Sequence, residues 1–169
     1  DDYDMSHLRA CGAGAEAYNN HQILRAQKYF VDHGCKARFT TGYGCSEAGS
    51  NMTLPMSPRP IADGNVGIPM PLSVIAAFKP GTQEELKYNE IGEICFASPS
   101  VMLGYDSKKA TARALQEHPD GRMWLHTGDI GYVTEEGVVY VFTRGTAHRF
   151  GFENCELATL PMENRLADA

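Results

Sequence analysis

The chain has 169 residues, of which 43% are hydrophobic and 21% charged, a composition typical of a globular domain with a buried core. Its net charge of −6 disfavours binding to nucleic acid, because phosphate contacts need clustered lysines and arginines. No apolar run approaches the roughly 20 residues of a membrane-spanning helix, so we expect neither a nucleic-acid partner nor a membrane span.

The cysteine content predicts a reducing environment. Five cysteines are scattered along the chain without any C-x-x-C spacing, and an odd count of this kind favours free thiols over a disulfide framework. We therefore expect a cytoplasmic location. The sequence begins with Asp1 rather than an initiator methionine, which suggests that it is part of a longer chain.

The first forty residues predict one α/β unit. Residues 8–15 predict a short strand that runs into a turn of small residues. Asn19 and Asn20 are good N-cap residues, and apolar residues recur after them at helical spacing until His33-Gly34. Residues 37–40 predict a second strand. This order is typical of parallel strands, whose ligands bind beyond their carboxyl ends.

The next stretch, residues 40–49, reads Thr-Thr-Gly-Tyr-Gly-Cys-Ser-Glu-Ala-Gly and places polar chemistry between glycines. Glycine allows the backbone to approach a ligand closely. Tyr43 offers a flat face to a heterocycle, Ser46 a donor to a phosphate, and Glu47 an oxygen to a hard cation. The alternative for these ten residues alone is an ordinary glycine-rich turn.

The second half of the chain changes character. Residues 51–72 contain five prolines and predict an irregular connector. Four apolar segments after it predict strands, at residues 74–78, 91–96, 124–133 and 137–143, with one short helix at 107–115. The expected fold is therefore α/β: the end of a parallel α/β layer followed by a small antiparallel β subdomain.

A carboxylate stands at a glycine turn in this second half. In Thr127-Gly128-Asp129, Asp129 has two oxygens that can accept both hydroxyls of a ribose, although a turn aspartate that caps its own backbone is the alternative. Arg144 ends the next predicted strand, and an antiparallel return of that length brings it beside Asp129. The alternative for Arg144 is a surface ion pair of little energetic value.

Four motifs in order resemble those of the adenylate-forming superfamily, which comprises acyl- and aryl-CoA synthetases, peptide-synthetase adenylation domains and luciferases. They are Gly42-Tyr43-Gly44-Cys45-Ser46-Glu47, Ile91-Gly92-Glu93-Ile94, Met102-Leu103-Gly104-Tyr105 and Trp124-Leu125-His126-Thr127-Gly128-Asp129-Ile130-Gly131-Tyr132. The resemblance covers about residues 5–145 and continues more loosely to the end.

The resemblance implies that a carboxylic acid is activated with ATP and Mg²⁺ as an acyl-adenylate. The acyl group then passes to a thiol acceptor, coenzyme A or the phosphopantetheine of a carrier protein. Ser46, in place of the usual threonine, and Glu47 are the implied catalytic residues, with Glu47 as the metal ligand. The implied adenosine- and AMP-binding residues are Gly14, Ala15, Tyr43, Gly44, Asp129 and Arg144. Among them Tyr43 would stack on adenine and Asp129 would hold the ribose.

The implied organisation has three parts: an α/β portion with the adenine and phosphate loop at 1–71, a small β subdomain with the ribose-binding turn at 72–145, and a hinge with a divergent start of the C-terminal lid at 146–169. The family's lysine-containing phosphate loop and most of its lid are absent from this sequence, and the hinge position is Thr146. We expect the remainder of a synthetase chain as a partner and an inactive isolated chain. The alternatives are a peptide-synthetase adenylation domain and a non-catalytic nucleotide-binding or assembly module.

Overall fold

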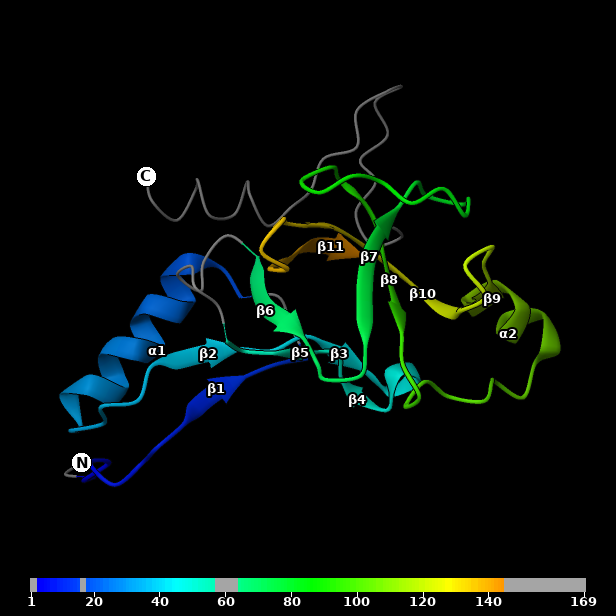
Figure 1. Ribbon diagram of the computed structural model, residues 1–169. Helices are drawn as coiled ribbons and strands as arrows, with labels where there is room; N and C mark the ends of the chain where they lie inside the picture. The colour runs from blue at the N-terminus through cyan, green and yellow to red at the C-terminus, as the bar shows by residue number, and fades with distance from the viewer. Residues whose placement is uncertain (1–2, 16–17, 57–63, 145–169) are drawn as a thin grey trace.

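The computed structural model describes residues 3–15, 18–56 and 64–144 (Figure 1). Its helices are α1 (Asn20–Asp32), the 3-10 turn η1 (Ser46–Ala48) and α2 (Lys108–Ala114). Its strands are β1 (Cys11–Ala13), β2 (Phe39–Thr41), β3 (Gly44–Cys45), β4 (Ser50–Asn51), β5 (Thr53–Leu54), β6 (Asn65–Pro69), β7 (Val74–Phe78), β8 (Gly92–Ala97), β9 (Leu115–Glu117), β10 (Met123–Val133) and β11 (Val139–Arg144). No helix within these ranges is long and apolar enough to cross a membrane.

Helix α1 begins and ends at its sequence signals. Asn19 and Gln22 form a capping box, in which each side chain accepts a hydrogen bond from the other's backbone N–H, at 2.9 and 3.0 Å. The helix ends at Asp32 with His33 as its C-cap, and Gly34 follows with a φ of +86°. The first predicted helix is therefore confirmed.

Strands β1 and β2 form a parallel pair, with Gly12 opposite Thr40, and α1 runs beside them (Figure 1). Phe30 of α1 stacks on Phe39 of β2, with ring centroids 5.8 Å apart. This is the only parallel pairing among the described strands, so the fold is mixed α/β with a mostly antiparallel sheet.

The main sheet has seven strands, in the order β5-β6-β11-β10-β8-β7, with β9 paired to β10. The four strands predicted for the second half are present as β7, β8, β10 and β11, and α2 is present at the predicted helix. The prediction that residues 51–72 are irregular is wrong at β5 and β6. Strand β6 pairs with β11 and β5, and this pairing overrides the local proline signal. Pro69 is the last residue of the strand.

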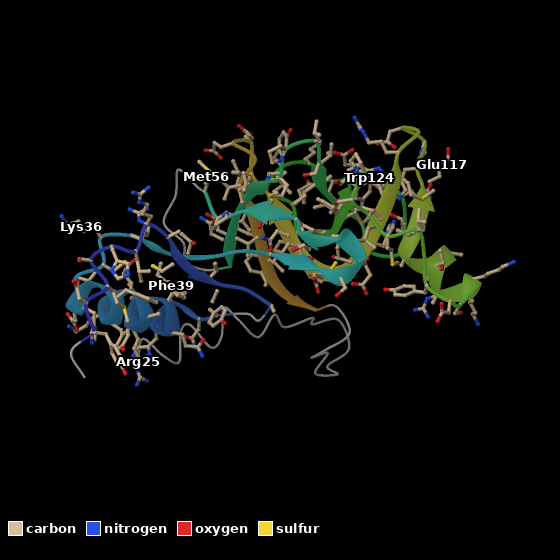
Figure 2. All side chains as sticks on the ribbon, turned by 90° about the horizontal axis from the view of Figure 1, so that it is seen from below. Arg25, Lys36, Phe39, Met56, Glu117 and Trp124 are labelled. Carbon is tan, nitrogen blue, oxygen red and sulfur yellow. The ribbon has the colours of Figure 1, made fainter. Side chains whose placement is uncertain are left out.

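Alternation along β8 builds two apolar clusters on opposite faces of the sheet. Ile94 and Phe96 belong to the larger cluster, together with Met52 and Ala48 from the segment after β3. Cys95 belongs to the smaller cluster with Trp124. The larger cluster thus anchors the glycine-rich stretch to the sheet. Figure 2 shows Trp124 in this β-rich part and Phe39 beside α1.

The predicted hinge at Thr146 and the predicted divergent start of the lid at 146–169 lie outside the described residues.

Candidate functional site

The two glycine turns predicted from the sequence meet through Tyr43 and Asp129. The Tyr43 hydroxyl donates a hydrogen bond of 2.6 Å to Oδ2 of Asp129, across 86 residues of sequence. Burial, and then the negative charge of Asp129, raise the pKa of Tyr43 far above its usual value. Tyr43 is therefore a neutral phenol that keeps its proton and donates a hydrogen bond to the Asp129 carboxylate. This pairing confirms that the two turns lie together.

Asp129 is held by the turn that precedes it. Thr127 donates its hydroxyl to the carbonyl oxygen of Ile94 at 2.6 Å and accepts the Asp129 N–H at 3.0 Å. The Gly128 N–H donates to Oε1 of Glu93 at 3.0 Å, and its φ of +74° is a conformation that favours glycine. The position of the Asp129 carboxylate is thus determined by bonds between β8 and β10.

Arg144 returns to Asp129 as predicted. The register of β10 and β11 places Asp129 directly opposite Arg144, and a bulge follows at Ile130 and Gly131. Only the backbone of Arg144 lies within the described part of the chain, so the register is the structural fact that bears on this residue. Its proposed assistance to Asp129 stays a prediction.

Glu47 is positioned by the segment 102–105, one of the four motifs that resemble the adenylate-forming superfamily. Tyr105 donates its hydroxyl to Oε1 of Glu47 at 2.6 Å, and the Met102 N–H donates to the Glu47 carbonyl oxygen at 2.8 Å. The motif 102–105 therefore contacts the predicted metal ligand through both backbone and side chain. The local sequence pattern does not predict this contact, because 58 residues separate Tyr105 from Glu47.

An open pocket of about 670 Å³ lies beside these contacts. Four of the predicted residues line it: Gly14 and Ala15 after β1, and Gly44 and Ser46 from the glycine-rich stretch. Tyr43, Glu47 and Asp129 are not part of this lining. The predicted residues therefore form two adjoining groups, a pocket of small residues and a pair of hydrogen-bonded polar contacts, joined by the chain at 42–47.

Gly44 has a steric reason to be glycine. A Cβ at this position would overlap the carbonyl oxygen of Ser50 and lie 2.8 Å from Cα of Asn51, because β3 and β4 form a close antiparallel pair. On the other side of the pocket, Ala15 has a φ of +68°, which is uncommon for a residue with a side chain. Such backbone strain is concentrated at functional sites.

The oxygen donors at Ser46 and Glu47 fit a hard divalent cation. A hydroxyl and a carboxylate from one 3-10 turn are the ligand types that Mg²⁺ takes, usually together with waters and substrate phosphates. Glu47 would hold the ion, and Ser46 stands one residue before it at the pocket.

Comparison with known proteins identifies the class. The chain belongs to the AMP-binding enzyme family, whose model matches residues 1–106, more than half of the chain. The resemblance to the adenylate-forming superfamily is therefore confirmed.

Two plant proteins illustrate the similarity in sequence. The chain is 31% identical over 147 residues to the 4-coumarate–CoA ligase of Pinus taeda, covering 84% of this chain and 26% of the ligase. It is 35% identical over 149 residues to 4-coumarate–CoA ligase 2 of Oryza sativa subsp. japonica, covering 84% of this chain and 24% of the ligase. The chain thus spans about a quarter of the length of these relatives.

Solved structures extend the similarity to the fold. A long-chain-fatty-acid–CoA ligase from Archaeoglobus fulgidus matches with a TM-score of 0.73 at 24% identity, over 84% of this chain and 29% of that one. At this identity the likeness concerns the fold alone. The luciferase-like enzyme of the mealworm Zophobas morio matches with a TM-score of 0.66 at 28% identity, over 84% of this chain and 33% of that one.

Proposed function

We propose that this chain is the adenosine-binding part of a cytoplasmic ligase that activates a carboxylic acid with ATP and passes it to coenzyme A. The observation that carries the proposal is the hydrogen bond between Tyr43 and Asp129. It joins an aromatic ring and a carboxylate, the two groups that recognise a base and a ribose. The names of the plant relatives, both CoA ligases, support the reaction class.

Asp129 would bind a ribose alongside Tyr43. An ionised carboxylate offers about four lone-pair sites, so the hydrogen bond from the Tyr43 hydroxyl to Oδ2 is compatible with more than one donor. Donation from Tyr43 fixes the carboxylate before the nucleotide arrives, which reduces the ordering cost of binding. Arg144, opposite Asp129 in the register, would add positive charge beside the ribose and phosphate.

The remaining residues supply position and charge. Gly14, Ala15 and Gly44 would let the nucleotide approach the backbone of the pocket. Ser46 would donate its hydroxyl to the α-phosphate as the acid carboxylate attacks phosphorus and pyrophosphate leaves. Mg²⁺ bound at Glu47 would neutralise phosphate charge. Tyr105 holds the Glu47 carboxylate in place for that task.

The 169 residues alone are expected to bind adenosine nucleotides without forming an adenylate. The sequence contains no glycine-rich phosphate loop with a lysine, and removal of a single charge-stabilising donor typically lowers a rate by about 10²–10³. Division into an α/β portion at 1–71, a β subdomain at 72–145 and a lid start at 146–169 is part of this proposal.

The test is acid-dependent exchange of pyrophosphate into ATP. The protein from the complete reading frame that contains this sequence is incubated with Mg²⁺ and with hydroxycinnamic, benzoic or fatty acids, beside the 169-residue chain. The proposal expects exchange with at least one acid, a loss of exchange in Glu47→Gln, and no exchange by the 169-residue chain. Absence of exchange with every acid, in a longer protein that still binds AMP, would favour a non-catalytic nucleotide-binding module.

A further inference from the structure

Three potential metal ligands converge between β8 and β10, away from the pocket. Glu93 and Cys95 lie on the same face of β8, and His126 stands opposite Cys95 in the register of β10. His126 Nδ1 lies 3.1 Å from Oε2 of Glu93 and 3.5 Å from Sγ of Cys95. All three donor atoms lie within 4.8 Å of one another.

One ring nitrogen of His126 faces two potential ligand atoms at once. Nδ1 of His126 carries either one hydrogen or one lone pair, yet it faces a carboxylate oxygen and a thiol sulfur together. The site is also removed from water, since the side chains of His126 and Glu93 are 6% and 13% exposed and Cys95 is fully buried. An ion placed between the three atoms would satisfy all of them at once.

The separations match a tetrahedral zinc site. Zinc binds sulfur at about 2.3 Å, nitrogen at about 2.0–2.1 Å and carboxylate oxygen at about 2.0–2.2 Å. Tetrahedral angles then place nitrogen and oxygen about 3.4 Å apart and nitrogen and sulfur about 3.6 Å apart. The observed 3.1 and 3.5 Å lie within a few tenths of an ångström of these values. A mixed set of sulfur, nitrogen and oxygen favours zinc over magnesium or calcium.

The second oxygen of Glu93 and the second ring nitrogen of His126, which are not needed as metal ligands, have contacts of their own. Oε1 of Glu93 accepts the Gly128 N–H at 3.0 Å. Nε2 of His126 lies 3.0 Å from Nε2 of His118, which is itself buried. Such outer contacts orient metal ligands and are typical of zinc sites.

We propose that Glu93, Cys95 and His126 are three ligands of one zinc ion. On binding, the thiol proton of Cys95 passes to solvent and the sulfur coordinates as thiolate. The ion would tie β8 to β10 directly before the turn that presents Asp129. This inference does not depend on the function proposed above.

Cobalt(II) is the probe, because a cobalt–thiolate bond gives a charge-transfer absorption in the near ultraviolet. The full chain is stripped with a chelator, titrated with cobalt(II) and then with zinc. We expect one saturable cobalt site per chain, displacement by zinc, and a rise in melting temperature with zinc concentration. Cys95→Ser abolishes the absorption, whereas Cys35→Ser, which removes a buried thiol in the α1–β2 part, retains it.

Glu93→Gln keeps the test decisive if Cys95→Ser does not fold. An amide oxygen can still accept the Gly128 N–H, but the charge is lost, and we expect cobalt affinity to fall at least about tenfold, the loss that even an outer-shell residue causes. The proposal is overturned if the folded chain shows no cobalt–thiolate absorption. It is also overturned if Cys35→Ser or Cys155→Ser removes the absorption, or if neither Cys95→Ser nor Glu93→Gln changes it.

Discussion

Removal of one oxygen atom, in Tyr43→Phe, tests the contact that joins the two halves of the site. The hydroxyl donates at 2.6 Å to a carboxylate that is only 9% exposed. A hydrogen bond to a charged group contributes about 1.5–3 kcal/mol. At about 2–4 °C per kcal/mol for a domain of this size, the melting temperature should fall by about 3–12 °C.

Thermal and denaturant unfolding are followed by the fluorescence of Trp124, the only tryptophan. The matched control is Tyr88→Phe, because Tyr88 is 61% exposed, and it should change stability by less than about 0.5 kcal/mol. A double-mutant cycle with Asp129→Ala isolates the pair. Should Tyr43→Phe cost as much in the Asp129→Ala background as in the wild type, the hydroxyl would contribute nothing through Asp129, and the reasoning would be refuted.

Two further predictions concern Asp120 and Tyr105. The backbone N–H of Arg122 lowers the pKa of Asp120 below 3.8, and the side chains of Trp124 and Arg122 add to the effect. The ionised Asp120 therefore stabilises the folded protein above that pH, and this contribution is lost as the pH falls through the lowered pKa of the folded state. The stability difference between wild type and Asp120→Asn should therefore shrink in acid, and a constant difference in urea unfolding between pH 5 and pH 2.5 would contradict this. Tyr105→Phe should raise the Mg²⁺ concentration needed for half-maximal pyrophosphate exchange in the longer protein and leave AMP affinity unchanged. If Mg²⁺ affinity and AMP affinity fell by the same factor, the contact of Tyr105 with Glu47 would be purely structural.

The elements that were predicted correctly are those whose sequence patterns lie within the element itself. The capping box at Asn19 and Gln22 and the apolar run of β7 need no distant partner to be recognised. The approach of Arg144 to Asp129 was also predictable, because β10 and β11 form an antiparallel hairpin, but the bulge between Ile130 and Gly131 decides that Arg144 stands directly opposite.

Features that depend on distant partners were not predictable from one sequence. Strand β6 exists because β5 and β11 pair with it, although prolines surround it. The hydroxyl of Tyr105 reaches Glu47 across 58 residues, and Glu93 reaches His126 across 33. The residue types at the site could be predicted from the sequence, whereas the contacts between them depend on the fold.

The most direct test of the proposed adenosine site is calorimetric titration of the 169-residue chain with AMP. The account predicts saturable binding that weakens roughly tenfold or more in Tyr43→Ala, since base–aromatic stacking contributes about 1–3 kcal/mol, and that also weakens in Asp129→Ala. Tyr88→Ala, at an exposed tyrosine, should bind as the wild type does. Unchanged AMP affinity in both Tyr43→Ala and Asp129→Ala, with both variants folded by Trp124 fluorescence, would contradict the claim that these residues form one adenosine site.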